Sequence, residues 1–157
     1  MKKLAVVLLI FISVLTVSVN CFAAPSVVES GNTGNTSSLI VIKKPETSVS
    51  STTKKNYTLT AVTLSGTEVS LYSYNPSTGL FELKKDAYGN PMTKIVGASG
   101  IYLQEINLAE ETNYMLVRAQ CDDGRYQNVR LNITLLNQSL LDSIKGFAAN
   151  FRTVFGR

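Results

Sequence analysis

Two runs of alternating apolar and polar residues flank the polar stretch 122–125, whose sequence is DDGR. Such alternation places every second side chain on the same face of a β-strand. Gly124 can supply the positive φ that a short hairpin loop demands. The pattern therefore predicts an antiparallel hairpin with one dry face, which other strands must cover. That face carries Met115, Val117, Ala119, Cys121, Val129, Leu131, Ile133 and Leu135.

Shorter segments of the same kind precede the hairpin, and residues typical of turns separate them. On the segment 69–74, Val69 and Leu71 point to one face, while Tyr72 and Tyr74 point to the other, outward face. Several short strands with frequent turns predict a mainly β chain folded as an antiparallel β-sandwich. Strands are expected over 39–42, 57–62, 69–74, 80–85, 92–96 and 101–108, with a polar connection over 46–55.

The spacing of the apolar residues changes after residue 136. Apolar residues recur at helical spacing over 140–155, and Ser139 with Asp142 resembles a capping box. The sequence therefore predicts a C-terminal amphipathic helix that must be held by packing, because isolated helices of this length are marginal. Its docking face carries Leu140, Leu141, Ile144, Phe147, Ala148, Phe151, Val154 and Phe155.

The sequence leaves three alternatives for the surface that buries the apolar face of this helix. It packs on its own sandwich, docks to a partner or second copy, or lies on a membrane surface. The membrane is the least favoured of the three, because the polar side of the helix has few cations, among them Lys145 and Arg152.

The N-terminal residues have the three parts of a secretory signal peptide. Lys2 and Lys3 are followed by an apolar run, and small residues at Cys21 and Ala23 suit cleavage after Ala23. A spanning helix needs roughly 20 apolar residues, and this run is shorter. A lipid-attached Cys21 is the lesser alternative. We therefore expect a secreted or extracellular protein, with surface association possible but without a sortase-type wall signal.

Removal of residues 1–23 changes what the composition implies. Lys+Arg falls from 15 to 13 while Asp+Glu stays at 11, so the formal charge falls from +4 to +2. This charge gives no basic footprint for nucleic acid. One cysteine, Cys121, then remains, so an intramolecular disulfide is excluded and the fold must rest on its apolar core. The expected organisation is signal peptide 1–23, flexible linker 24–38, sandwich 39–136 and helical segment 137–157.

Four short motifs resemble the bacterial immunoglobulin-like modules of secreted and surface proteins, which include accessory domains of polysaccharide-degrading enzymes. The motifs are IVIKKP at 40–45, SGTEVSLY at 65–72, INLAEETN at 106–113 and VRAQCDDG at 117–124. The resemblance covers most of the chain after residue 23, and residues 75–100 depart from the usual pattern. It implies an immunoglobulin-like fold and an extracellular address, but no ligand.

Candidate catalytic and metal-binding residues are few. The chain has no histidine, which removes the usual general base and the commonest zinc ligand. Cys121 shares the parity of the dry face, so we interpret it as a small buried hydrophobe rather than a reactive thiol. Asp122 and Asp123 are turn residues rather than a calcium site, because Ca²⁺ takes six to eight oxygens. We therefore predict a non-enzymatic protein without a metal or cofactor.

The aromatic residues are the stronger candidates for binding. Tyr72, Tyr74, Phe81 and Tyr88 gather in the middle of the domain, and exposed tyrosines can stack on sugar rings or anchor a partner. Ordinary cross-strand pairing is the alternative, and the chain has no tryptophan for a sugar-stacking platform.

Three functions therefore compete. The first is a secreted module for extracellular or cell-surface interaction with a protein, and the second is a carbohydrate-binding accessory domain that uses Tyr72, Tyr74 and Tyr88. The third, a small hydrolase, would need paired carboxylates in a deep pocket. An aromatic-lined groove favours the second over the first, whereas a flat face favours the first. The carboxylates available to a hydrolase are Glu105, Glu110 and Glu111.

Overall fold

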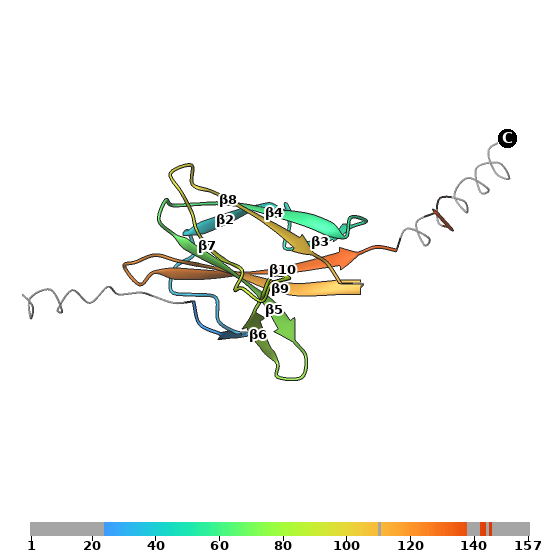
Figure 1. Cartoon of the computed structure of the whole chain (residues 1–157), viewed down its shortest axis with the longest axis horizontal. Coiled ribbons are helices and arrows are strands. Elements are labelled where there is room, and N and C mark those ends of the chain that lie inside the picture. The colour runs from blue at the N-terminus through green and yellow to red at the C-terminus, as the bar shows by residue number, and fades with distance from the viewer. Residues whose placement is uncertain (1–23, 110, 138–141, 144, 146–157) are drawn as a thin grey trace, which may run out of the picture.

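A computed structural model describes residues 24–109, 111–137, 142, 143 and 145. This part of the chain forms ten strands in two sheets that lie one above the other (Figure 1). The larger sheet has the order β1-β6-β5-β9-β10-β3, with β7 also paired to β5, and the smaller sheet has the order β2-β4-β8. The strands are β1 Val27–Glu29, β2 Ile40–Lys44, β3 Val49–Thr52, β4 Asn56–Thr63, β5 Glu68–Asn75, β6 Leu80–Leu83, β7 Thr93–Ile95, β8 Ile101–Asn107, β9 Glu111–Gln120 and β10 Tyr126–Leu135.

The predicted hairpin is confirmed as β9 and β10, which pair antiparallel from Gln120 opposite Tyr126 to Glu111 opposite Leu135. The Cys121 amide donates to the Arg125 carbonyl at 2.9 Å and closes the turn. Gly124 has the expected positive φ, of 84°. The alternation that the sequence shows is therefore the alternation of the two faces of this hairpin.

The core lies between the two sheets and combines the inward side chains of both. The predicted parity is confirmed on β5, where Val69 and Leu71 are fully buried, and on β4 Leu59 and Ala61 are fully buried in the same core. Cys121 is partly buried against this core, with its Sγ 3.6 Å from the Thr67 hydroxyl. The remaining large members of the core are Leu39, Ile40, Val96, Tyr102, Ile106, Leu108, Met115, Val117, Leu131 and Ile133.

The prediction of a flexible linker over 24–38 is wrong for most of that segment. Residues Val27–Glu29 form β1, which pairs antiparallel with β6, and Val28 is buried. Farther on, the Asn35 amide donates to the Tyr126 carbonyl at 3.0 Å, and the Asn128 amide donates to the Thr33 carbonyl at 3.0 Å. The polar composition suggested disorder because it has little to bury, but these residues are held by hydrogen bonds to β10.

The polar connection predicted over 46–55 also contains a strand. β3 pairs parallel with β10, with Val49 opposite Asn132, and forms an edge of the large sheet. Polar side chains suit an edge strand, because much of such a strand faces water. Composition alone therefore did not distinguish this strand from a loop.

Two predictions fall outside the described residues. These are the signal peptide over 1–23 and almost all of the helix over 140–155. Of the latter, only Asp142, Ser143 and Lys145 are described; these three have helical backbone, but the elements of the described chain are all strands. Within the described residues, no helix has the length and apolar character needed to cross a membrane. The predicted docking face also lies outside: Leu140, Leu141, Ile144, Phe147, Phe151, Val154 and Phe155.

Candidate functional site

The outer face of the large sheet carries a second, smaller apolar cluster. Tyr72, Phe81 and Leu116 pack there with Val28 of β1, and Tyr72 has no exposed surface. The Tyr72 hydroxyl donates to the Pro25 carbonyl at 2.8 Å. Burial raises the pKa of Tyr72 to about 12. The N-terminal strand, paired to β6 at the edge of the sheet, therefore closes this cluster on one side with Val28, and the rest of the face stays open.

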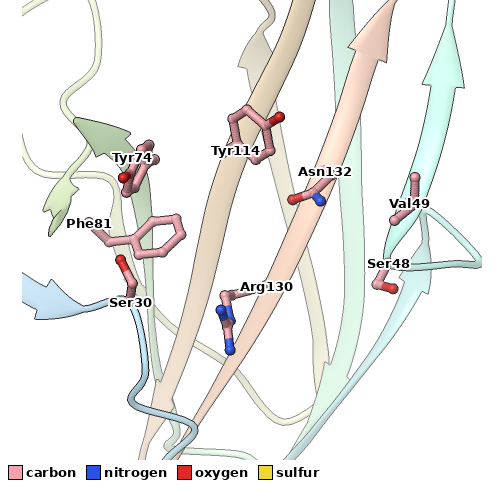
Figure 2. A pocket seen from close by; sticks show the side chains of 8 residues that line it. All are labelled: Ser30, Ser48, Val49, Tyr74, Phe81, Tyr114, Arg130 and Asn132. Carbon is pink, nitrogen blue, oxygen red and sulfur yellow. The ribbon is translucent and has the colours of Figure 1, made fainter. Parts of the chain in front are cut away.

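Beside this cluster lies a groove of about 540 Å³, which we call the aromatic groove. Its volume is within the range of about 300–1,000 Å³ that is usual for ligand sites. Figure 2 shows it from close by, with an aromatic wall on one side and a polar wall on the other. The groove runs across β6, β5, β9, β10 and β3, and its lining residues are Ser30, Ser48, Val49, Tyr74, Phe81, Tyr114, Arg130 and Asn132.

The aromatic wall is held by ring contacts between neighbouring strands. The Tyr74 and Phe81 rings have centroids 5.4 Å apart and planes tilted by 60°, and the Tyr74 and Tyr114 rings meet edge to face at 6.2 Å. Such geometries are the favoured ones for aromatic pairs, so the rings fix one another. Tyr74 is 38% exposed and Tyr114 is 50% exposed. The wall therefore offers two part-exposed tyrosines to a ligand at little entropic cost.

The polar wall is formed by β10 and β3, with Arg130 and Asn132 as its largest side chains (Figure 2). No described carboxylate lies within 4.0 Å of the Arg130 guanidinium. Arg118 on the same face of the sheet contrasts with it, because it lies over the Tyr126 ring at 4.0 Å and donates twice to the Gln120 amide oxygen. Arg130 therefore keeps its donors available for a ligand that carries acceptors or negative charge.

The three tyrosines predicted to bind ligand have different positions. Tyr74 lines the groove as expected, whereas Tyr72 is on the predicted face but buried in the cluster with Val28 of β1, so it cannot contact a ligand. Tyr88 is 90% exposed in the turn between β6 and β7 and does not line the groove. The sequence analysis did not identify Tyr114 and Arg130 as site residues. Their outward parity in the hairpin pattern could have indicated that they lie on the same face as Tyr74.

Comparison with known proteins does not assign this chain to a family. No protein-family model matches this sequence, and no curated protein matches it. The site must therefore be interpreted from its own residues.

The described lining of the groove limits the chemistry that its side chains can offer. Its lining contains no carboxylate, histidine or cysteine, so the groove itself holds no acid–base pair. Ser30 donates its hydroxyl proton to the Gly79 carbonyl at 2.7 Å, and none of the described residues that line the groove is a histidine or carboxylate that could act on it as a general base. Within the described residues, no group of three or more His, Cys, Asp or Glu residues is arranged to hold a metal ion. The groove offers aromatic surface, amide and hydroxyl groups and one cation.

Proposed function

We propose that this protein is a secreted, non-catalytic immunoglobulin-like module that binds an extracellular ligand in the aromatic groove. The observation that carries the proposal is the pairing of two part-exposed tyrosines with the unpaired Arg130 across one groove. Ligand sites commonly combine apolar and aromatic walls with a few well-placed polar groups.

The strand order supports the immunoglobulin-like part of the proposal. In variable-type immunoglobulin domains, strands A, B and E share one sheet, while G, F, C and C′ are neighbours in the other. Taken in chain order, β2, β4 and β8 occupy the places of A, B and E. In the large sheet, β10, β9, β5 and β6 occupy the places of G, F, C and C′. With this assignment, which we propose, the groove corresponds to the outer face of the GFCC′ sheet.

Of the ligand classes that the sequence left open, a carbohydrate is the one we favour. The face is hollowed and lined by aromatic residues, whereas a flat face would favour a protein partner. Tyr74 and Tyr114 can contact the apolar side of a sugar ring, and Asn132 and Arg130 can bond its hydroxyl or carboxylate oxygens. An acidic sugar also uses the unpaired charge of Arg130. A protein partner that inserts a side chain beside Tyr114 is the second candidate.

Affinity electrophoresis tests the proposal, with the full chain run in gels that contain acidic polysaccharides (alginate or polygalacturonate) or neutral ones (xylan or β-glucan). We expect retardation in the acidic gels. Tyr114→Ala should weaken binding by about 2 kcal/mol, or roughly 30-fold, as for a central aromatic contact. Arg130→Gln should weaken binding to the acidic polysaccharides and reduce its salt dependence.

Tyr88→Ala is the matched control, because Tyr88 is an exposed tyrosine outside the groove. If Tyr88→Ala and Tyr114→Ala reduced retardation equally, the groove would not be the site. Absence of retardation in every gel would reject the carbohydrate and leave the protein partner as the candidate ligand.

Export is part of the same proposal and has its own test. The basic and apolar residues before Ala24 support cleavage after Ala23 by a signal peptidase. N-terminal sequencing of the exported protein should therefore start at Ala24 or within one residue of it. A product that retains residues 1–23 would identify this segment as an anchor instead.

A further inference from the structure

The outer face of the small sheet carries four aliphatic side chains that are neighbours in the strand register. Val41 lies opposite Val62, and Val62 lies opposite Ile101, so these three form a row across β2, β4 and β8. Leu103 lies two residues farther along the same face of β8. All four are between 41% and 52% exposed, and we call them the outer patch.

The fold itself does not require apolar residues here. The inward neighbours Ile40, Ala61 and Tyr102 already fill the core side of the same three strands. The outer face of an antiparallel sheet is normally polar when water covers it. Adjacent aliphatic side chains on such a face are typical of a surface that another element covers.

We propose that the C-terminal segment 138–157 docks on the outer patch of the same molecule. Eight apolar residues of this segment recur at helical spacing within 140–155, three of them phenylalanines, and they share one stripe if the predicted helix forms. Such a stripe gains stability only where it is covered, because a helix of this length is marginal alone. Each of the two surfaces thus supplies the cover that the other needs.

The C-terminal segment starts near the end of the small sheet from which it can run along the sheet towards the outer patch. The Leu136 amide donates to the Thr52 carbonyl at 2.8 Å, and four residues after Thr52 the chain begins β4 at Asn56. Asn56 pairs with Asn107 at the end of β8, so the segment leaves beside the end of the small sheet that is remote from Val62. In Figure 1, β2, β4 and β8 form the upper layer, and the arrow of β10 points to the right-hand side.

The length of the segment matches the distance to be covered. From Asn56 to Val62 is six residues of strand, or about 20 Å at roughly 3.3 Å per residue. A helix over 140–155 would be about 24 Å long at 1.5 Å per residue. The helix, laid along β4, therefore spans the face from its near end to the outer patch.

The small size of the outer patch favours a tethered occupant over a second copy. Stable interfaces between separate chains use about 20–30 residues on each side, whereas the outer patch has four aliphatic residues. A short tether instead gives an effective concentration in the millimolar range, so a small contact area suffices. The inference is independent of the ligand groove, which lies on the outer face of the other sheet.

A single tryptophan reports on docking, because the chain has none of its own. In the full chain with Phe151→Trp, we expect blue-shifted emission that acrylamide quenches poorly. Adding Leu103→Lys should lower the ratio of docked to undocked segment about tenfold, because a partly covered leucine contact is lost and an ammonium group is desolvated. Val62→Lys should act in the same direction. Circular dichroism confirms that each variant keeps its strands.

Ile95→Lys is the matched control, since Ile95 is an exposed aliphatic residue on β7 of the large sheet. It should leave the emission and quenching of the introduced tryptophan unchanged. Three results would overturn the proposal: full quenching of Phe151→Trp without a second change, equal effects of Leu103→Lys and Ile95→Lys, or shielding that appears only as protein concentration rises. The last result would assign the cover to a second copy.

Discussion

Replacing Gly34 by alanine is expected to lower the free energy of unfolding by about 2–5 kcal/mol. Gly34 has a φ of 102°, which L-residues rarely adopt, and it forms a bridge with Gln127 at the start of β10. A Cβ at this position would press on the Tyr126 carbonyl oxygen and lie 2.8 Å from the Gln127 Cα, both of which are backbone atoms. The chain cannot relieve this contact by a side-chain rotation, so strain and overpacking add.

Urea unfolding of the full chain, followed by circular dichroism, measures this effect. Gly31→Ala is the control, because no heavy atom lies within 4 Å of the Cβ that it would add. We expect this control to change stability by less than about 0.5 kcal/mol. Equal, small effects of the two substitutions would mean that residues 32–36 contribute little to the domain, contrary to their hydrogen bonds with β10.

Raising the pH from about 10 to 12 is expected to remove about 2 kcal/mol of stability through Tyr72 alone. Burial raises the pKa of Tyr72 to about 12, while the unfolded chain has a tyrosine pKa near 10. The neutral phenol is therefore favoured in the folded state. Its contribution is fully present below pH 10 and is lost as the pH rises through 12. Burial also raises the pKa of Tyr102 and Tyr57, so both act in the same direction.

The test is the slope of unfolding free energy against pH above about 10, compared between the parent chain and Tyr72→Phe. The variant loses its bond to the Pro25 carbonyl, worth about 1 kcal/mol at neutral pH, so the slope and not the absolute stability is the readout. We expect a shallower slope for Tyr72→Phe. Tyr88→Phe, which changes a 90% exposed side chain, should keep the parent slope. Identical slopes in all three proteins would contradict the assignment to Tyr72.

The same tyrosine shows where inference from the sequence stopped. Its parity was predicted correctly, since Tyr72 and Tyr74 point away from the face of Val69 and Leu71 that enters the core. What buries Tyr72 on that outer face was not predictable, because β1 comes from a segment with one buried valine and no alternating run. Exposure depends on a neighbour 44 residues away in the chain, where Val28 packs beside Tyr72.

The groove could not be predicted from the sequence for a similar reason. The sequence pattern indicated every strand that lines the groove except β3. The groove itself exists only because β6, β5, β9, β10 and β3 are neighbours in that order. Arg130 and Tyr114 were visible as outward residues of a hairpin. Their approach to Tyr74 depends on the pairing of β5 with β9, in which Tyr72 lies opposite Leu116.

The sequence by itself determined the features that follow from local periodicity. It specified the β9–β10 hairpin, the turn at Gly124 and the inward faces of β5, β9 and β10, because alternation fixes which side chains share a face. The tertiary structure alone decided which strands are adjacent, that the polar segments 24–38 and 46–55 contribute β1 and β3, and which outward residues are covered. These outcomes depend on long-range backbone hydrogen bonds, and such bonds leave no periodic pattern in the side chains.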